Sequence, residues 1–459
     1  MRLFSVLALL ALVQPSSPTP ASSPVVVLNH VSVLDVEAGI LLPDRAVVLE
    51  GGRIRAVQEA AAFKLPDGAR EIDLTGRYLV PGFIEMHAHV LSNPWDEEGS
   101  LLPRFDRGST LQMLRLLLAH GITTARDPGA PTETAVTLRN MIAAGAAAGP
   151  NLLTAGRIIN GSTFNPEPFS PVADEAQVRE EVRWQAAAGV DFIKIYGSMT
   201  PELTRAAIEE AHAHGLRVIG HLGRTTWKRA AELGIDAIAH GASWSPEELP
   251  EAARADYQQS MFGRVYWLEH LDLDAPPARE MVDALVRHGV TVDPTLIAYH
   301  TKFFGNDPRW VQHPQLALAP EMFRRGWPKG SFTASWTDEQ FQLAKAQWPK
   351  MQALTKRLFD RGVLLTVGTD TPTPWIIPGL SFHEELELLH DTGIPPADLL
   401  RMAPWNGARA LGKEDRGAVK PGLRADLVVL RANPLAEIRN TREIELVIQG
   451  GKIVISISS

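Results

Sequence analysis

The sequence predicts an α/β protein in which a (β/α)₈ barrel of the TIM type carries a small β-sandwich-like domain formed by both chain ends. Short β-branched runs alternate with Ala- and Leu-rich helical stretches through the middle of the chain, which is the rhythm of βα units. Both ends instead alternate apolar and polar residues, as strands of a half-buried sheet do. At 459 residues, the chain is long enough for one barrel and one smaller domain.

Four segments make up the expected domain organisation. They are a signal peptide over residues 1–23, the N-terminal part of the β-domain over 24–80, the barrel over 81–412 and the C-terminal part of the β-domain over 413–459. In the first segment, Arg2 precedes an apolar run over residues 3–13, which is too short for a membrane span of about 20 residues. This pattern is typical of a secretory signal. We therefore expect an exported protein, periplasmic or secreted, with no membrane span in the mature chain.

Eight candidate strands lie in the middle region, and eight parallel strands with intervening helices is the count of a (β/α)₈ barrel. They cover residues 83–90, 122–127, 151–158, 192–197, 217–222, 236–241, 290–296 and 364–370. Two longer stretches interrupt the rhythm, residues 91–109 after the first strand and residues 297–350 after the seventh. Stretches of this kind either shape a pocket or elaborate the surface, and the sequence leaves both interpretations open.

The composition limits the chemistry. The chain has no cysteine, which excludes disulfides, thiolate metal sites and cysteine nucleophiles. Any metal must therefore be held by His, Asp, Glu or a modified Lys. The formal net charge is −8 and no Lys/Arg cluster runs along the chain, so we expect a small-molecule substrate rather than a nucleic acid. Association into a homo-oligomer stays open.

The first chemical signal is the segment PGFIEMHAHV at residues 81–90. His87 and His89 are two residues apart on a predicted strand, so both side chains point to the same face. At the carboxyl end of a barrel strand this face is the barrel mouth, where active sites of such barrels lie. Two imidazoles there make a ready metal chelate. Alone the pair is a weak signal, because most such pairs are surface or core histidines.

Four further side chains fall at or near the carboxyl ends of other predicted strands. They are Lys194 in strand four, His221 in strand five, His240 in strand six and Asp370 in strand eight. A lysine buried without a partner is costly, and Lys194 lies in an otherwise apolar strand. The convergence of four histidines, one lysine and one aspartate on a single rim indicates a metal centre.

These motifs resemble those of the amidohydrolase superfamily, in particular its prolidase-like and imidazolonepropionase-like branches. The marks are VPGFIEMHAH, GITTARDPG, the lysine in IKIYG, the two later histidines and VGTD. The tail GARALGKEDRGAVKPGLRADLVVL also resembles the closing segment of the family, in which the last helix returns the chain to the β-domain. The resemblance covers nearly the whole mature chain and implies a metal-dependent hydrolase.

The resemblance also implies a role for each of the six residues. The ligands carried over are His87, His89, Lys194, His221, His240 and Asp370. His87, His89 and Asp370, from strands one and eight, would hold the more buried of two divalent metal ions. His221 and His240, from strands five and six, would hold the more exposed one. Lys194, carboxylated by CO₂, would bridge the two metals. Zinc suits this set of imidazole and carboxylate donors, while Mn, Co and Fe stay open.

The reaction implied is hydrolysis of an amide bond, in a dipeptide or an N-acyl amino acid. By hypothesis a hydroxide that bridges the metals attacks the carbonyl, and Asp370 acts as general base and then as general acid. Tyr196 and Arg224 are candidate substrate contacts, although a packed tyrosine and a surface arginine are the competing interpretations. Arg126 and Asp127 are interpreted as a structural ion pair that supports the barrel mouth.

Two alternatives remain. One is a mononuclear hydrolase or deaminase that acts on a cyclic amide or an imidazolone. Such relatives usually lack the bridging lysine, and deaminases carry a glutamate near the strand-five histidine, whereas this chain has Lys194 and reads HLGRTTW after residue 220. The other is a non-catalytic barrel scaffold, which is disfavoured because all six ligand positions are filled.

Overall fold

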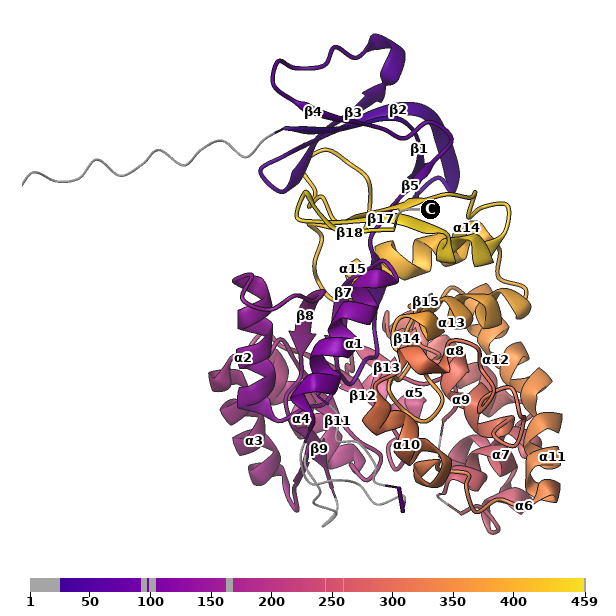
Figure 1. Cartoon of the computed structure of the whole chain (residues 1–459). Coiled ribbons are helices and arrows are strands. Elements are labelled where there is room, and N and C mark those ends of the chain that lie inside the picture. The colour runs from indigo at the N-terminus through magenta and orange to yellow at the C-terminus, as the bar shows by residue number, and fades with distance from the viewer. Residues whose placement is uncertain are drawn as a thin grey trace, which may run out of the picture.

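The structure is a computed structural model, and it describes residues 25–91, 97–98, 105–161, 168–243, 245–258 and 260–457. The predicted signal peptide therefore lies outside the described residues. Figure 1 shows a helix-covered barrel with a second layer of strands at one end, where the first and last described segments lie side by side. In the part of the chain that is described, no helix combines the length and apolarity that crossing a membrane requires.

The barrel strands run in parallel and in chain order. They are β6 (Phe83–Glu85), β7 (Ile122–Asp127), β8 (Asn151–Thr154), β9 (Ile158–Asn160), β11 (Phe192–Ile195), β12 (Arg217–Gly220), β13 (Ala237–Ala239), β14 (Thr291–Asp293) and β15 (Leu364–Leu365). They form two ladders, β6–β7–β8 and β9–β11–β12–β13–β14–β15. At one seam the amide of Asp191 donates to the carbonyl of Thr154 at 2.9 Å, and at the other Ala88 bridges Thr371 in parallel. The barrel is closed, with β8 and β9 sharing the third of its eight positions.

The third barrel position differs from the single strand predicted over residues 151–158. The chain breaks between β8 and β9 at Gly156, whose φ of +86° is a conformation that only glycine adopts easily. A further parallel strand, β10 (Phe169–Pro171), then pairs with β9. Several other strands are shorter than predicted, because their last residues leave the ladder to build the loops at the barrel mouth.

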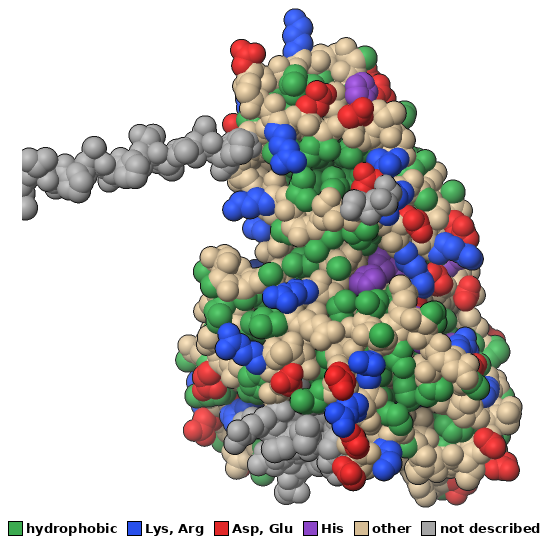
Figure 2. Space-filling view, in the orientation of Figure 1, with side chains coloured by type: hydrophobic (Ala, Val, Ile, Leu, Met, Phe, Trp, Pro, Cys, Tyr) green, Lys and Arg blue, Asp and Glu red, His purple; other side chains and the backbone are tan. Residues whose placement is uncertain are grey.

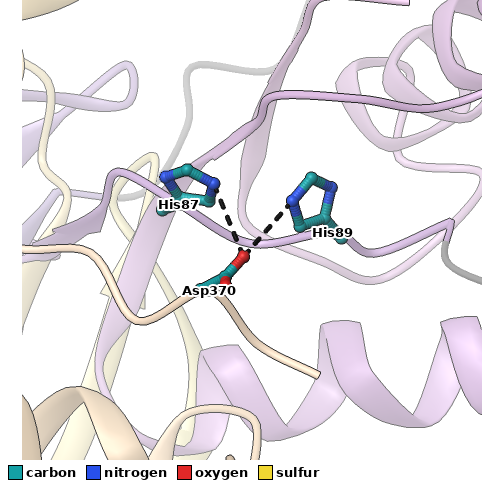
Figure 3. A group of neighbouring side chains, drawn as sticks. All are labelled: His87, His89 and Asp370. Atoms are coloured by element: carbon teal, nitrogen blue, oxygen red, sulfur yellow. Dashed lines mark ion pairs between the residues drawn. The ribbon is translucent and has the colours of Figure 1, made fainter. Parts of the chain in front are cut away.

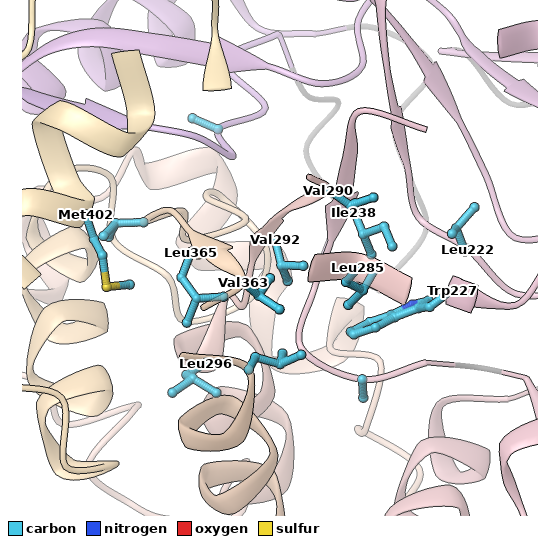
Figure 4. Packing of buried hydrophobic residues seen from close by; sticks show 14 of the residues in the cluster. Leu222, Trp227, Ile238, Leu285, Val290, Val292, Leu296, Val363, Leu365 and Met402 are labelled. Atoms are coloured by element: carbon cyan, nitrogen blue, oxygen red, sulfur yellow. The ribbon is translucent and has the colours of Figure 1, made fainter. Parts of the chain in front are cut away.

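Helices surround the strands, and several of them pack apolar faces against the strands. They are α1 (Arg107–Ala119), α2 (Thr132–Ala143), α3 (Glu175–Ala188), α4 (Pro201–Ala213), α5 (Trp227–Glu232), α6 (Glu251–Arg254), α7 (Met261–His270), α8 (Pro276–Arg287), α9 (Leu296–Phe303), α10 (Glu321–Gly330), α11 (Asp338–Ala346), α12 (Trp348–Asp360), α13 (Leu380–Asp391), α14 (Pro396–Arg401) and α15 (Gly407–Ala410). Figure 4 shows Ile238 near Trp227 of α5 and Leu285 of α8, while Val292 and Leu365 of the next two strands lie further along the same buried cluster. These buried contacts hold the strand ends, and thus the barrel mouth, in fixed positions.

The two chain ends share one mixed sheet. Its strands are β1 (Val26–Asp35), β2 (Ile40–Glu50), β3 (Arg53–Glu59), β4 (Arg70–Asp73), β5 (Tyr78–Pro81), β16 (Leu427–Leu430), β17 (Ile444–Gln449) and β18 (Lys452–Ser456). Strand β5 pairs antiparallel with β16, which joins the N-terminal half of the sheet to the C-terminal half. Val47, Leu79 and Leu427 belong to one buried apolar cluster. The prediction of one small β-domain built from both ends is confirmed.

Charges of both signs alternate over the surface. On the face shown in Figure 2, acidic and basic side chains of the described residues are interspersed. Many of them pair across neighbouring helices; Arg179 of α3, for example, contacts Glu209 of α4 at 2.6 Å. The mixture accords with the modest net charge of the sequence.

Candidate metal centre

One cavity of about 410 Å³ lies at the carboxyl ends of the barrel strands. All six predicted metal ligands line it, and we call them the inner wall: His87, His89, Lys194, His221, His240 and Asp370. They come from segments that are far apart in the sequence. Lys194 lies within β11 near its carboxyl end, and the other five follow strands, with both His87 and His89 after β6. The structure thus brings together every residue of the predicted constellation.

Three of these side chains form a compact group. Nε2 of His87 and Nε2 of His89 lie 3.6 and 3.5 Å from Oδ1 of Asp370, and Figure 3 shows both rings turned toward this carboxylate. One ligand atom from each residue lies within 4.8 Å of the others, a spacing that a single metal ion can span. The backbone holds the group, since the amide of Asp370 donates to the carbonyl of His87 at 2.8 Å. Asp370 has a φ of +67°, the kind of strained conformation that recurs at functional sites.

Two further imidazoles extend this group along the cavity. The ring centroid of His240 lies 4.8 Å from that of His87 and 4.3 Å from that of His221. Nδ1 of His240 is 2.8 Å from the hydroxyl of Thr295, which fixes the orientation of the ring and leaves the other nitrogen to act as a ligand. The imidazoles of His240 and His221 thus continue the group of three along the cavity.

Lys194 contributes an amine to the same cavity. Its side chain is fully buried, and among the described residues its Nζ has no hydrogen-bond partner. Burial lowers the pKa of Lys194 to about 8, although Asp293 opposes this shift. A buried amine without a partner is costly, whereas a carbamate on the same nitrogen would offer anionic oxygens to two cations. The donor set of the inner wall therefore fits a two-metal centre with a carboxylated lysine.

Asp293, at the end of β14, orients one of the histidines. Its Oδ2 lies 2.7 Å from Nδ1 of His87, and its Oδ1 accepts from Nη2 of Arg126 at 2.8 Å. A carboxylate on the second nitrogen of a histidine is the usual support of a metal ligand. Asp293 was not among the predicted site residues, because it lies in the middle of the strand predicted over residues 290–296, whereas the observed strand ends at it.

The predicted ion pair between Arg126 and Asp127 is wrong. Arg126 pairs with Asp293, and its Nε also donates to the carbonyl of Met86 at 2.7 Å. Asp127 instead accepts from the backbone amides of Gly129 at 3.1 Å and Val90 at 3.2 Å. Successive residues of a strand point to opposite faces, so neighbours in the sequence serve different partners here.

Glu85, the last residue of β6, ties two strand ends together. Its carboxyl group accepts from the backbone amides of His87 at 2.8 Å and Thr369 at 3.0 Å, and contacts the hydroxyl of Thr369 at 2.9 Å. The side chain is fully buried, and this burial raises its pKa to about 8. Glu85 lies inside a motif that the sequence analysis singled out, but its partner Thr369 is far away in the sequence. It was therefore missed.

Residues after the sixth and seventh barrel strands form another part of the cavity lining. We call Met261 and Arg264 of α7, Tyr299 and Lys302 of α9, and Phe332 the outer wall. The stretch 297–350 thus shapes the pocket rather than merely elaborating the surface. Most of the residues between 91 and 105 in the other long stretch lie outside the described ones.

The two candidate substrate contacts lie in different places. Tyr196 lines the cavity, and its ring centroid is 4.4 Å from that of His221. Arg224 is exposed and does not line the cavity; its backbone amide donates to the carbonyl of Gly197 at 2.8 Å. The arginine that lies at the site is Arg264, whose Nη2 is 2.9 Å from Nε2 of His221.

Known proteins that resemble this chain in sequence or in structure include hydrolases of the amidohydrolase family. A model of the amidohydrolase family matches residues 78–454. The chain is similar to an imidazolonepropionase of Streptomyces griseus, with 23% identity over 414 residues that cover 85% of this chain and 87% of the relative. It is also similar to the crystal structure of a candidate prolidase from Bifidobacterium longum, with a TM-score of 0.70, 25% identity and 95% of each chain covered. A Xaa-Pro dipeptidase solved with bound methionine in its active site has the same fold at 20% identity and a TM-score of 0.70, with 94% of this chain and 99% of that chain covered.

Proposed function

Because the chain belongs to the amidohydrolase family, we propose that it hydrolyses the amide bond of a dipeptide or an N-acyl amino acid at a two-metal centre. Its relatives make it a hydrolase of carbon–nitrogen bonds, which sets aside the alternative of a non-catalytic scaffold. The observation that carries the proposal is Lys194, a buried amine without a hydrogen-bond partner among the described residues, in a cavity lined by four histidines and an aspartate.

In the proposal the inner wall holds two divalent cations, with zinc as the first choice. The side chains of strands one and eight would hold the more buried cation and those of strands five and six the more exposed one, and Lys194, once carboxylated, would supply anionic oxygens to both. When bound, such a pair of cations activates water as a nucleophile and polarises the scissile carbonyl.

Asp370 is the proposed proton carrier. Burial acts to raise its pKa, but the hydrogen bond from His89 and the nearby positive charges outweigh it and hold the pKa well below the ordinary value. The carboxylate is therefore ionised at neutral pH and can accept the proton of the attacking water. It then returns this proton to the leaving amine. Burial raises the pKa of Tyr196 to about 12, so its hydroxyl remains a hydrogen-bond donor for the substrate.

A second candidate function is hydrolysis of a cyclic amide at a single metal ion. The similarity to an imidazolonepropionase favours this alternative. Lys194 argues against a single metal ion. A one-metal site needs no bridging group, so the buried amine of Lys194 would stay without a partner at a cost in free energy.

Metal analysis together with an activity screen tests the proposal. We expect about two metal ions per chain, and hydrolysis within a library of Xaa-Pro and Xaa-Arg dipeptides and N-acyl amino acids. Lys194→Met should lower both the metal content and the activity. One metal ion per chain with activity only on imidazolones would instead favour the second candidate. We further propose export with removal of residues 1–23, which N-terminal sequencing of the mature protein would check.

A further inference from the structure

Helix α9 contributes to both walls of the cavity. Its residues Tyr299 and Lys302 belong to the outer wall. Thr295, immediately before the helix, contacts the ring of His240 on the inner wall, with 2.8 Å between its hydroxyl and Nδ1 of the ring. The backbone joins the same two segments, because the amide of His240 donates to the carbonyl of Asp293 at 2.9 Å. The first turn of α9 is therefore placed directly beside a proposed metal ligand.

Glu385 of α13 holds this first turn in place. Its carboxylate accepts from the backbone amide of Leu296 at 2.8 Å through Oε1 and from that of Ile297 at 2.6 Å through Oε2. Both amides are among the first four of the helix, which have no acceptor inside it. All three residues are buried, so the two amides would be left unsatisfied if the carboxylate were removed.

Thr295 has an uncommon backbone conformation. Its φ of +48° and ψ of +49° lie in the left-handed region, which β-branched residues rarely adopt. Such a conformation persists only where the surrounding structure determines it. Here Glu385 holds the two amides that follow Thr295, and the hydroxyl of Thr295 meets His240. If the start of the helix shifted, this hydroxyl would leave Nδ1 of His240 and the ring would lose its fixed orientation.

Glu385 does not line the cavity, and among the described residues its side-chain hydrogen bonds go to α9 only. We propose that Glu385 is a positioning residue, which fixes the start of α9 and thereby holds His240 in the orientation that binds the more exposed of the two proposed metal ions. The inference rests on the proposed function. The side chains of Asp293 and Glu85 hold the segments of ligands to the more buried ion, so Glu385 gives the exposed ion a support of its own.

A titration of the metal-free protein with Co²⁺, followed by the visible absorption of the bound ion in bicarbonate buffer, tests the proposal. Glu385→Gln replaces one acceptor oxygen with an NH₂ group, so one of the two helix amides loses its partner with little change in shape. His240→Ala identifies which of the two binding steps depends on His240. We expect Glu385→Gln to weaken this step about 10–100-fold, as lost support of a metal ligand does, and to leave the other step unchanged.

Glu384 offers a matched control, because it is the neighbour of Glu385 in α13 but contacts other elements. It accepts from the hydroxyl of Ser381 at 2.8 Å and lies 3.4 Å from Nε2 of His313. Glu384→Gln should leave both binding steps unchanged. Thr295→Val removes the hydroxyl and should weaken the same step as Glu385→Gln, whereas Thr295→Ser keeps the hydroxyl and should retain it.

The two steps together decide the outcome. Unchanged affinities in Glu385→Gln would overturn the positioning role, and so would an equal loss in both steps, which a merely structural role predicts. Glu385→Asp, one methylene shorter, should have the same selective effect and replaces Glu385→Gln if that variant does not fold.

The titration also separates this inference from the proposed function, because it needs no turnover. A selective loss in Glu385→Gln without hydrolysis of any library member would support the positioning role and count against the proposed reaction. Uptake of a single ion by the wild type would contradict the two-metal centre. The role of Glu385 would then be judged on that ion: weaker binding in both His240→Ala and Glu385→Gln supports it, and unchanged binding in Glu385→Gln overturns it. Uptake of no ion would overturn both proposals.

Discussion

The inner and outer walls of the cavity are built in different ways. The inner wall consists of side chains at the ends of barrel strands, and buried hydrogen bonds such as those of Glu85 and Asp293 fix their positions. The outer wall consists of side chains on α7 and α9 and on the segment that follows, which the chain inserts after the sixth and seventh barrel strands. In barrels of this type the strand ends usually carry the catalytic groups, and the loops inserted between them vary and shape the pocket.

The largest expected effect belongs to the inner wall. Asp370→Asn keeps the shape and one ligand oxygen of the side chain but removes its ability to carry a proton. We expect kcat to fall by about 10²–10⁴-fold, with most of the metal retained, because general acid–base catalysis contributes about this much. Steady-state kinetics and metal analysis on one preparation would check it. Full activity in this variant would contradict the assigned role.

Replacing Asp293, which supports His87 of the inner wall, should affect both stability and metal binding. Asp293→Asn removes the charge that pairs with Arg126 and orients His87, both of which are buried. We expect the free energy of unfolding to fall by about 3–5 kcal/mol, as for other broken buried pairs, and the metal affinity to fall about 10–100-fold. Urea unfolding and zinc titration are the measurements.

The control for that change is an exposed ion pair. Asp283→Asn breaks the contact with Arg361, in which both side chains are largely exposed. Its effect on the free energy of unfolding should stay within about 1 kcal/mol. A similar loss of unfolding free energy in both variants would show that the buried pair stabilises the fold no more than the exposed one does.

Glu85 links two parts of the inner wall, so its removal should loosen them. Glu85→Ala leaves the buried amides of His87 and Thr369 without their acceptor. We expect a loss of about 2–4 kcal/mol in the free energy of unfolding, since each buried group left unsatisfied costs about 1–3 kcal/mol. Thermal unfolding checks the stability, and Glu85→Gln, which keeps an acceptor oxygen, should lose less.

The smallest expected effect belongs to the outer wall and depends on pH. Burial, opposed by Asp370 and aided by Arg264, lowers the pKa of Lys302 to about 8. The ammonium is charged below this pH and loses its proton as the pH rises through it. Because this ammonium lines the cavity, we expect kcat/KM for a substrate with an anionic group there to fall severalfold above about pH 8 in the wild type. Lys302→Arg should abolish this fall, because an arginine keeps its proton.

The six inner-wall residues could be predicted because each belongs to a short motif at a strand end, and the βα rhythm places all strand ends on one rim. Asp293 and Glu85 also end strands, but their roles depend on partners distant in the sequence, so no local pattern reveals them. Arg224 was chosen for its nearness to His221 in the sequence, yet the chain turns outward there. Arg264 and Lys302 lie on inserted helices, whose placement depends on packing rather than on a local repeat.

The pairing of β5 with β16 has a consequence for how the molecule is assembled. Strand β16 follows the whole barrel in the sequence, so the sheet cannot be completed before the barrel has been translated. Until then β5 presents an unpaired edge, which is the kind of surface through which nascent chains aggregate. The pairing of β5 with β16 is therefore the last step in completing the sheet. Losing the final strands by truncation would reopen it next to the first strand of the barrel.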